Sequence, residues 1–180
     1  LYRYHNQMKI PLPITRLIDN FQRLPGIGPK TAQRLTFQLL HFPQQDLEQF
    51  ANNLISLKTQ TTLCDTCKNV SQSNQCLICQ DTMRDKNKIL VVSTALDSFA
   101  IEKSGYNGLY HVLHGVIDPL NNIGPNELFI NDLIVRIKKY TTEEAYNLSI
   151  DNPLEIIIAT NSSMEGESTS MYLTKLIKDT

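Results

Sequence analysis

The sequence predicts a multidomain protein of mixed α and α/β class. An all-helical module spans residues 8–61, a four-cysteine segment spans 62–84, and an α/β domain with a mostly parallel sheet spans 85–180. Three observations predict this division. Helical spacing of apolar residues dominates the first third of the chain, all four cysteines lie between residues 64 and 79, and short β-branched runs alternate with helical stretches after that. Each segment therefore has its own source of stability.

The composition is that of an ordinary globular protein, with 41% hydrophobic and 19% charged residues in a chain of 180. No apolar run approaches the roughly 20 residues that span a bilayer. Leu1–Gln7 lack the apolar core of a signal peptide, which predicts a cytoplasmic protein without membrane association. Because Met8 is a natural start, we interpret Leu1–Gln7 as an upstream extension or an expression remnant.

The net charge of −1 hides an asymmetry between the two ends of the chain. Residues 8–61 carry six Lys and Arg against three Asp and Glu, whereas residues 85–180 carry eight against thirteen. A basic front and an acidic back indicate that nucleic acid, if bound, meets the front. A few charges on a small segment are also common without any such role, so the charge alone decides nothing.

The first segment is expected to fold into three helices, over residues 13–24, from Pro29 to just before Pro43, and over 46–58. Apolar residues recur at helical spacing in each. Pro25 and Gly26 end the first helix, and Pro29 suits the first position of the second because its missing N–H is not needed there. The stripe expected to be buried in the third helix consists of Leu47, Phe50, Leu54, Ile55 and Leu57.

The loop between the first two helices carries the first chemical signal. Gly26, Ile27 and Gly28 would allow a turn whose backbone N–H groups face outward, and the positive end of the following helix favours a phosphate. Lys30 lies in the first turn of that helix and Arg34 four residues further along the same face. This pattern predicts a site that holds a DNA backbone without reading its sequence. The simpler interpretation is an ordinary turn between two helices.

The cysteines form the most specific pattern in the chain. Cys64 and Cys67 make one Cys-x₂-Cys pair and Cys76 and Cys79 a second, eight residues later. Two such knuckles supply the four thiolates of a closed, tetrahedral Zn²⁺ site, which leaves no open position for a catalytic water. The surrounding residues are too polar to form a core, so we expect structural zinc to hold this segment together.

The sequence predicts alternating strands and helices for the last segment, residues 85–180. Strands are expected over 89–92, 109–113 and 156–159, and helices over 95–104, 126–140 and 167–178. This alternation is typical of βαβ units around a parallel sheet. His111 and His114 lie near the end of a strand but lack a third ligand at an obvious spacing, so we expect them to serve packing or hydrogen bonding rather than metal binding.

The order of these segments resembles the RecR family of bacterial recombination mediators, in which a helix-hairpin-helix module and a four-cysteine zinc finger precede a Toprim domain. The resemblance covers nearly all of residues 8–178. It is carried by Leu24–Arg34 and the cysteine spacing, together with the segments 110–115, 118–120, 123–125, 159–161 and 165–167. By this resemblance the hairpin cations that contact DNA are Lys30 and Arg34.

The resemblance also implies a role in DNA repair and a set of partners. RecR-like proteins act with RecO-like and RecF-like proteins to load RecA onto gapped DNA, which places them at the nucleoid, and they assemble into dimers and ring-shaped tetramers. RecR-like proteins continue beyond the helix that ends near Thr180, so the resemblance implies a truncated chain and puts ring closure in doubt.

The Toprim-like domain lacks the acids of catalytic members, which use a Glu after the first strand and an Asp-x-Asp after a later one to hold Mg²⁺. Ser93, Asn161 and Ser163 stand at these positions. Asn161 fits the family, whereas Ser93 departs from it because the family commonly keeps a Glu there. We therefore expect no enzyme activity. Other acids lie nearby in the motifs and form a candidate docking surface for a partner, an inert rim or a weak metal site: Asp97, Glu102, Glu165 and Glu167.

Two alternatives remain at this point. One is a divergent Mg²⁺-dependent nuclease or primase-like enzyme that uses Glu102, Glu165 and Glu167. The other is a protein–protein adaptor whose hairpin binds no DNA. The salt dependence of DNA binding separates the adaptor from a DNA-binding protein, because phosphate contacts release counterions.

Overall fold

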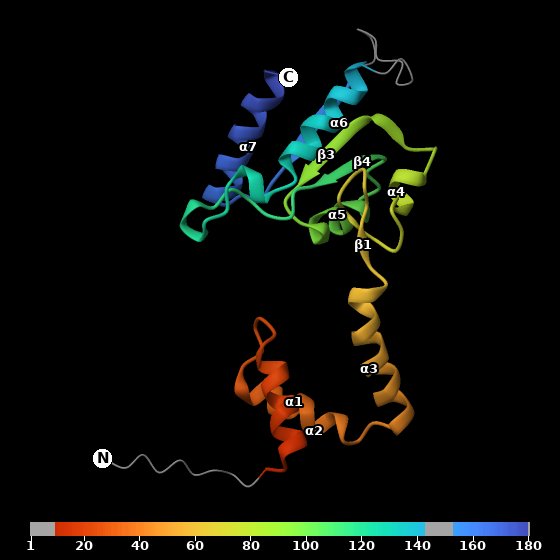
Figure 1. The fold of residues 1–180 in the computed structure, drawn as a ribbon, viewed down its shortest axis with the longest axis vertical. Coiled ribbons are helices and arrows are strands. Elements are labelled where there is room, and N and C mark those ends of the chain that lie inside the picture. The colour runs from red at the N-terminus through yellow and green to blue at the C-terminus, as the bar shows by residue number, and fades with distance from the viewer. Residues whose placement is uncertain (1–9, 143–152, 180) are drawn as a thin grey trace, which may run out of the picture. The chain divides into compact units, whose positions relative to one another are not determined.

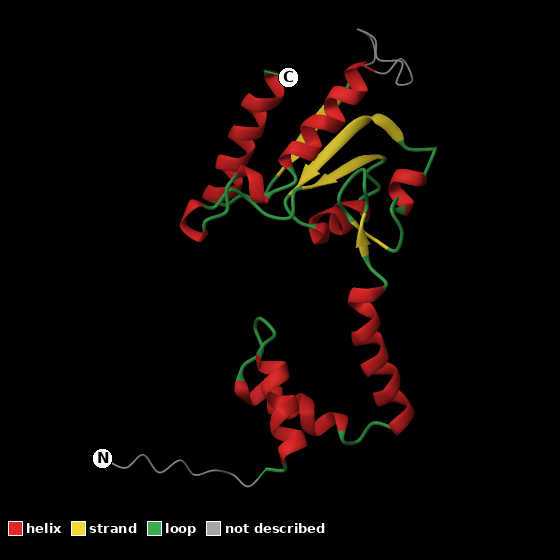
Figure 2. Ribbon diagram, in the orientation of Figure 1, coloured by secondary structure: helices red, strands yellow, loops and turns green. Residues whose placement is uncertain are grey.

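The computed structural model describes residues 10–142 and 153–179, and the interpretation of Leu1–Gln7 lies outside them. The chain divides into two compact units between Thr59 and Gln60. The first is entirely helical and the second contains both sheets (Figure 2). No helix in the described ranges is both long enough and apolar enough to cross a bilayer. The predicted class, helical module plus α/β domain, is confirmed.

The first unit contains three helices, α1 (Leu12–Gln22), α2 (Pro29–Leu39) and α3 (Gln44–Thr59). Helices α1 and α2 pack against each other and bury Ile18, Ala32 and Thr36. The Thr36 hydroxyl donates a 2.9 Å hydrogen bond to the Ala32 carbonyl, which satisfies its only polar side-chain atom inside this small core. The hairpin is therefore a defined unit built on two helices.

The expected burial of α3 is wrong. No residue of α3 is buried; Leu47 is half-buried, and the other members of its predicted stripe are exposed: Phe50, Leu54, Ile55 and Leu57. Helical periodicity shows which residues share a face, but it does not show whether the same chain covers that face. The described residues provide no such cover for α3.

The second unit is built on a three-stranded sheet in the order β4-β3-β5, with β3 (Asp85–Val92) between β4 (Gly108–Val112) and β5 (Glu155–Ala159). Both pairings are parallel, with Leu90 opposite Tyr110 and Ile157. Parallel strands need crossover connections, and α5 (Ala95–Glu102) and α6 (Ile130–Thr142) lie in them. The predicted parallel sheet is therefore correct.

Alternate residues of the strands pack into two cores, one on each side of the sheet. Figure 1 shows α6 on one side of the sheet and α5 on the other. Ile89 and Val91 of β3 pack in a cluster with residues of α6 and of α7 (Met164–Lys178), whereas Leu90 and Val92 pack in a cluster that includes residues of α5. The side chains follow the twofold period of a strand buried on both faces. The result is a three-layer domain with β3 at its centre.

Two helix boundaries differ from the expected ones for local reasons. The expected helix over 126–140 begins only at Ile130, because a short 3₁₀ turn, Pro125–Glu127, comes first and the Glu127 carboxylate accepts a hydrogen bond from the Gly124 N–H. Helix α7 begins at Met164 rather than at 167, because the Ser163 side chain caps it by accepting from the Gly166 N–H.

His111 and His114 have the packing and hydrogen-bonding roles expected of them. His111 is fully buried and its Nε2 lies 2.8 Å from the Phe129 carbonyl oxygen. Its Nδ1 has no hydrogen-bond partner among the described residues. His114 Nε2 lies 2.6 Å from the Lys68 carbonyl oxygen, and its ring makes an edge contact with Phe129. Both rings therefore tie β4 to neighbouring loops.

This arrangement predicts a pH-dependent stability. Burial lowers the pKa of His111 to about 4. Between about pH 6.5 and 4 the unfolded chain binds a proton that the folded chain does not, so stability falls as the pH drops through this window. The shift corresponds to about 3 kcal/mol. We expect urea unfolding of His111→Gln, which keeps a donor for Phe129, to vary less with pH than wild type; equal pH profiles would contradict this account.

Candidate zinc centre and nucleic-acid interface

The four cysteines converge on one point. They lie in a segment with two two-residue strands, β1 (Thr62–Leu63) and β2 (Val70–Ser71), and the short helix α4 (Leu77–Gln80). All four Sγ atoms lie within 4.8 Å of one another, and Cys67 and Cys76 Sγ are 3.5 Å apart. Tetrahedral zinc with Zn–S bonds of about 2.3 Å separates its sulfurs by roughly 3.8 Å. The donor set and its spacing fit Zn²⁺.

The protons on these thiols show what a bound cation must replace. The hydrogen bond between the Cys67 and Cys76 sulfurs lowers the pKa of Cys76 to about 2 and raises the pKa of Cys67 to about 12. Hydrogen bonding to Cys67 also raises the pKa of Cys79 well above its usual range. Zn²⁺ bound by four thiolates displaces those protons.

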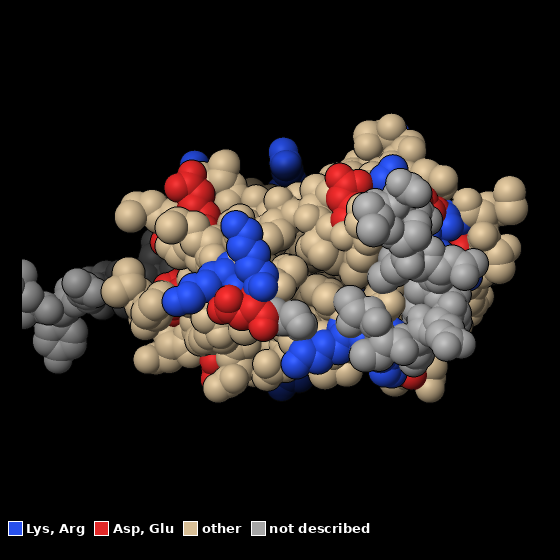
Figure 3. Space-filling model, turned by 90° about the horizontal axis from the view of Figure 1, so that it is seen from above, with Lys and Arg blue, Asp and Glu red and all other residues tan. Residues whose placement is uncertain are grey.

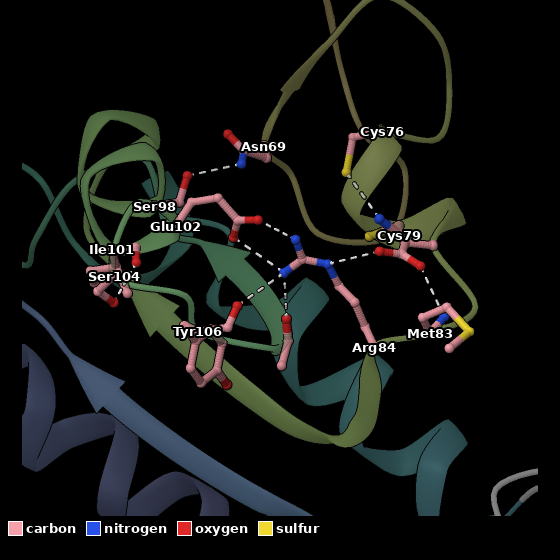
Figure 4. A network of polar contacts seen from close by, with 12 residues as sticks. Asn69, Cys76, Cys79, Met83, Arg84, Ser98, Ile101, Glu102, Ser104 and Tyr106 are labelled. Atoms are coloured by element: carbon pink, nitrogen blue, oxygen red, sulfur yellow. Dashed lines mark hydrogen bonds and ion pairs between the residues drawn. The ribbon is translucent and has the colours of Figure 1, made fainter.

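Backbone and side-chain contacts fasten the zinc finger to the α/β domain. The Val112 N–H donates to the Cys67 carbonyl at 2.9 Å, so a hydrogen bond joins the first knuckle to the end of β4. Figure 4 shows a second contact, in which the Asn69 side-chain amide donates to the Ser98 hydroxyl of α5 at 2.9 Å. Both Asn69 and Ser98 are buried. The finger is therefore part of the second compact unit rather than a separate appendage.

Arg84, which sequence reasoning did not single out, is the centre of a polar network at the junction of finger and sheet (Figure 4). Its guanidinium binds both carboxylate oxygens of Glu102 and also donates to the Gly108 carbonyl at 3.1 Å. Arg84 also faces Asp81 at 3.6 Å. The hydrogen bond from Arg84 holds the pKa of Glu102 below its usual range. The only feature of the sequence that could have indicated this network is the position of Arg84, between the second cysteine knuckle and β3.

This network changes the interpretation of the acidic residues. Glu102 lies at the end of α5, beside the starts of β3 and β4. Asp97 lies in the first turn of α5 and Glu165 in the first turn of α7, and these helices follow the carboxyl ends of β3 and β5. Glu102 was grouped with the other acids by sequence, but its ion pair with Arg84 places it at the amino ends of β3 and β4. Of the three acids that the enzyme alternative uses, Glu102 is already ion-paired with Arg84.

The remaining acids, Asp97, Glu165 and Glu167, lie in the first turns of helices, where a carboxylate stabilises the helix. Asp97 completes a capping box with Thr94, whose N–H and hydroxyl each donate to its carboxylate at 2.8 Å. Glu165 is half-buried and Glu167 exposed, both in the first turn of α7, where acidic side chains suit the helix dipole.

The three positions that hold acids in catalytic Toprim domains carry no carboxylate here. Ser93 is buried at the end of β3, and Ser163 caps α7. Asn161 is exposed, and its carbonyl lies so close to α7 that a Cβ on Gly166 would be 2.0 Å from the oxygen. A hydroxyl, an amide and a capping hydroxyl supply no negative charge for a hard cation.

The hairpin presents the start of α2 to solvent. Gly26 has a φ of +79°, which a residue with a side chain rarely adopts, and Gly28 is the N-cap of α2 with no side-chain cap. Lys30 and Arg34 are both exposed, and neither forms an ion pair with a described residue. Within the described ranges, the first turn of α2 therefore offers N–H groups without a side-chain cap, and its first two turns carry two available cations on one face.

One detail of the expected hairpin is corrected. The Ile27 N–H donates to the Leu24 carbonyl at 3.2 Å, so the turn itself uses this amide and Ile27 is half-buried. The amide donors left for an outside anion are those of the flanking glycines and the first turn of α2.

Figure 3 shows one face of the molecule with basic and acidic side chains interspersed. A mixed surface of this kind does not provide the continuous basic stripe that tracks a DNA backbone. The part of this face that the structure describes therefore adds no second candidate interface beside the hairpin.

Comparison with known proteins agrees with the fold and the site. Residues 87–180 match the Toprim domain family, and residues 14–57 match the family described as RecR, helix-hairpin-helix. With the cysteine cluster between them, these define a protein that joins a helical hairpin, a four-cysteine metal site and a Toprim domain.

Curated relatives specify the family. The chain is 48% identical to the recombination protein RecR of Lactobacillus johnsonii, 46% to that of Lactobacillus delbrueckii subsp. bulgaricus and 45% to that of Staphylococcus aureus. Each alignment covers 95% of this chain and 81% of the relative. The chain belongs to the RecR recombination protein family.

Proposed function

We propose that this protein is a non-catalytic recombination mediator that holds DNA by its backbone and works with RecO-type and RecF-type partners to promote loading of RecA on gapped DNA. The observation that carries the proposal is the start of α2, where uncapped N–H groups lie beside Lys30 and Arg34. A helix N-terminus with two cations binds phosphate through charge-assisted hydrogen bonds. The N–H groups of a helix start suit phosphate oxygens and hold the two cations at the backbone, so we propose that the binding is independent of sequence.

The direct test compares two unrelated DNA duplexes of equal length at one salt concentration. We expect the same affinity for both, because the phosphate backbone is the same in each. No binding to either duplex would favour the adaptor alternative, and a strong preference for one duplex would show base recognition that the hairpin does not provide.

Structural zinc, held by Cys64, Cys67, Cys76 and Cys79, completes the proposal. When bound, the ion would link the two knuckles through four thiolate ligands and leave no coordination position for water. Because the Cys67 carbonyl accepts from Val112 of β4, a correctly folded knuckle also supports the edge of the sheet.

The exposed face of α3 supports assembly of this chain with a second copy. Leu47, Phe50, Leu54 and Leu57 follow the spacing of a coiled-coil seam, and none of them is buried. An apolar helical seam of this kind is stabilised by burying it against an equivalent helix. We propose that α3 contributes to a homodimer and that such dimers are the units from which a larger ring would be built.

This face makes a prediction about mass in solution. Leu54→Glu places a charge in the middle of the seam, and we expect it to shift a dimer toward monomer without unfolding the chain, because Leu54 is 58% exposed. Asn52→Glu adds the same charge on the opposite, exposed side of α3 and should leave the dimer intact. Light scattering reports both; a wild-type monomer, or a dimer insensitive to Leu54→Glu, would contradict this interface.

A further inference from the structure

An exposed aromatic side chain lies on the outward face of α2. Phe37 is 46% exposed, and it follows Arg34 by three residues and Lys30 by seven in the same helix. At about 100° of rotation per residue, the three side chains fall within an arc of about 60°. Ala32 and Thr36, which α2 buries, lie on the opposite side of the helix. Phe37 therefore shares the face of the two cations and not the face that forms the core.

The neighbours of Phe37 distinguish it from an ordinary exposed apolar residue, which needs no explanation when it stands alone on a surface. The ring lies on the face of Lys30 and Arg34, and no ion pair among the described residues uses either cation. Helix α2 contains no Asp or Glu, and Asp19 of α1, the acid of the hairpin, is exposed and pairs with neither cation. Within the described residues this face is therefore cationic and aromatic, without a counter-charge.

Single-stranded DNA is the ligand that such a face fits. Proteins that bind single strands combine cations along the phosphates with aromatic rings on which the bases stack. Along the helix axis, Arg34 lies about 6 Å from Lys30, and Phe37 lies about 4.5 Å beyond Arg34. The ring is therefore close enough to take the base of a nucleotide whose phosphate meets Arg34. A duplex offers the same phosphates, but its bases are already stacked on one another.

An apolar segment of a partner protein fits this face less well. Leu40 and Phe42, beyond the end of α2, are also exposed and would extend an apolar contact from Phe37. Covering the face with such a segment would, however, take Lys30 and Arg34 out of water without supplying an anion, which is costly. Nucleic acid supplies the anions and the flat apolar surface together. Charge complementarity therefore favours nucleic acid.

We propose that Phe37 stacks on an unpaired base and gives the hairpin a preference for single-stranded over duplex DNA. This preference rests on the proposed function, because Lys30 and Arg34 hold the phosphates of the same strand. The stacking contact depends on whether a base is unpaired and not on which base it is. The unpaired strand of a gap is then the part of the DNA that the hairpin holds most tightly.

Two labelled oligonucleotides of equal length separate the ring contact from the phosphate contacts. One is a thymidylate strand, and the other is an abasic strand that has the same phosphates but no bases. We expect the wild-type chain to bind the thymidylate strand more tightly in fluorescence anisotropy, because that strand alone has bases to stack on Phe37.

Variants of Phe37 assign the difference to the ring. Phe37→Ala should weaken thymidylate binding between about fivefold and about a hundredfold, the effect of losing one base from an aromatic ring. Phe37→Leu, which keeps an apolar side chain but no ring, should weaken it too. Both should bind the abasic strand as wild type does. Phe99→Ala, which removes a similarly exposed ring from the second unit, should bind both strands as wild type does.

Phe37→Trp reports the contact directly. The chain contains no other tryptophan, so the indole fluorescence comes from this position alone. We expect the thymidylate strand to quench this fluorescence and the abasic strand to leave it unchanged, because stacking needs a base.

Equal wild-type affinity for the two strands, an unquenched indole, or unchanged thymidylate binding by Phe37→Leu would each overturn the stacking contact while leaving phosphate binding intact. A smaller mass of Phe37→Leu in light scattering would overturn it as well, since the ring would then belong to a contact between copies of the protein. Wild-type chain that binds neither strand nor duplex would instead refute the proposed function, and the preference with it.

Discussion

Replacing Cys67 with serine is expected to remove zinc from the protein and unfold residues 62–84. Structural zinc contributes on the order of 10–16 kcal/mol to the folding of isolated four-ligand peptides, and the finger has no alternative core of comparable size. The buried residues of its own cluster are the cysteines Cys64, Cys67 and Cys76. A loss of several kcal/mol in the free energy of unfolding is expected, as for removal of a buried metal ligand.

Metal content by mass spectrometry and urea unfolding measure the two effects. Gln72→Ala, an exposed change in the same segment, serves as the control and should retain one zinc per chain. The loss should extend to the sheet, because the end of β4 donates to the Cys67 carbonyl. Wild-type protein that holds no zinc when prepared reduced and without chelator would refute the metal site, as would full stability of Cys67→Ser.

Changing Lys30 and Arg34 together to alanine is expected to weaken DNA binding at least about tenfold, and by the same factor on every sequence. Both side chains are exposed, so the fold should be retained. Arg16→Ala combined with Lys58→Ala removes the same charge from exposed positions on α1 and α3 and serves as the matched control. Fluorescence anisotropy with a labelled oligonucleotide gives the affinities; equal losses in the two double variants would mean that net charge, not the hairpin, binds DNA.

The sequence was sufficient for those elements whose residues interact locally or repeat regularly. The β-branched runs predicted the parallel sheet because a strand buried on both faces must be apolar throughout, and Ile89–Val92 is. The cysteine spacing predicted the cluster because each knuckle is a local turn whose ligands need only two residues between them.

What the sequence could not supply depends on the spatial relation of distant residues. The seam of α3 has the periodicity of a buried face, and only the fold shows that the described chain leaves it open. Glu102 appeared to belong with Asp97, yet it lies at the far end of α5 and binds Arg84 at the amino ends of β3 and β4. The sequence also gave no sign that Arg136 of α6 is buried, at 6% exposure, because an arginine on an amphipathic helix is ordinarily solvated.

The most direct test of DNA binding through the backbone is the salt dependence of the association constant. For duplex DNA, each phosphate contact contributes about 0.9 to the slope of log K against log salt. We expect a clear negative slope for the wild-type chain. The slope should become shallower by the contribution of roughly two phosphate contacts in Lys30→Ala combined with Arg34→Ala, and should be unchanged in the Arg16 and Lys58 control. An unaltered slope in the Lys30 and Arg34 variant would show that the hairpin does not hold the DNA backbone.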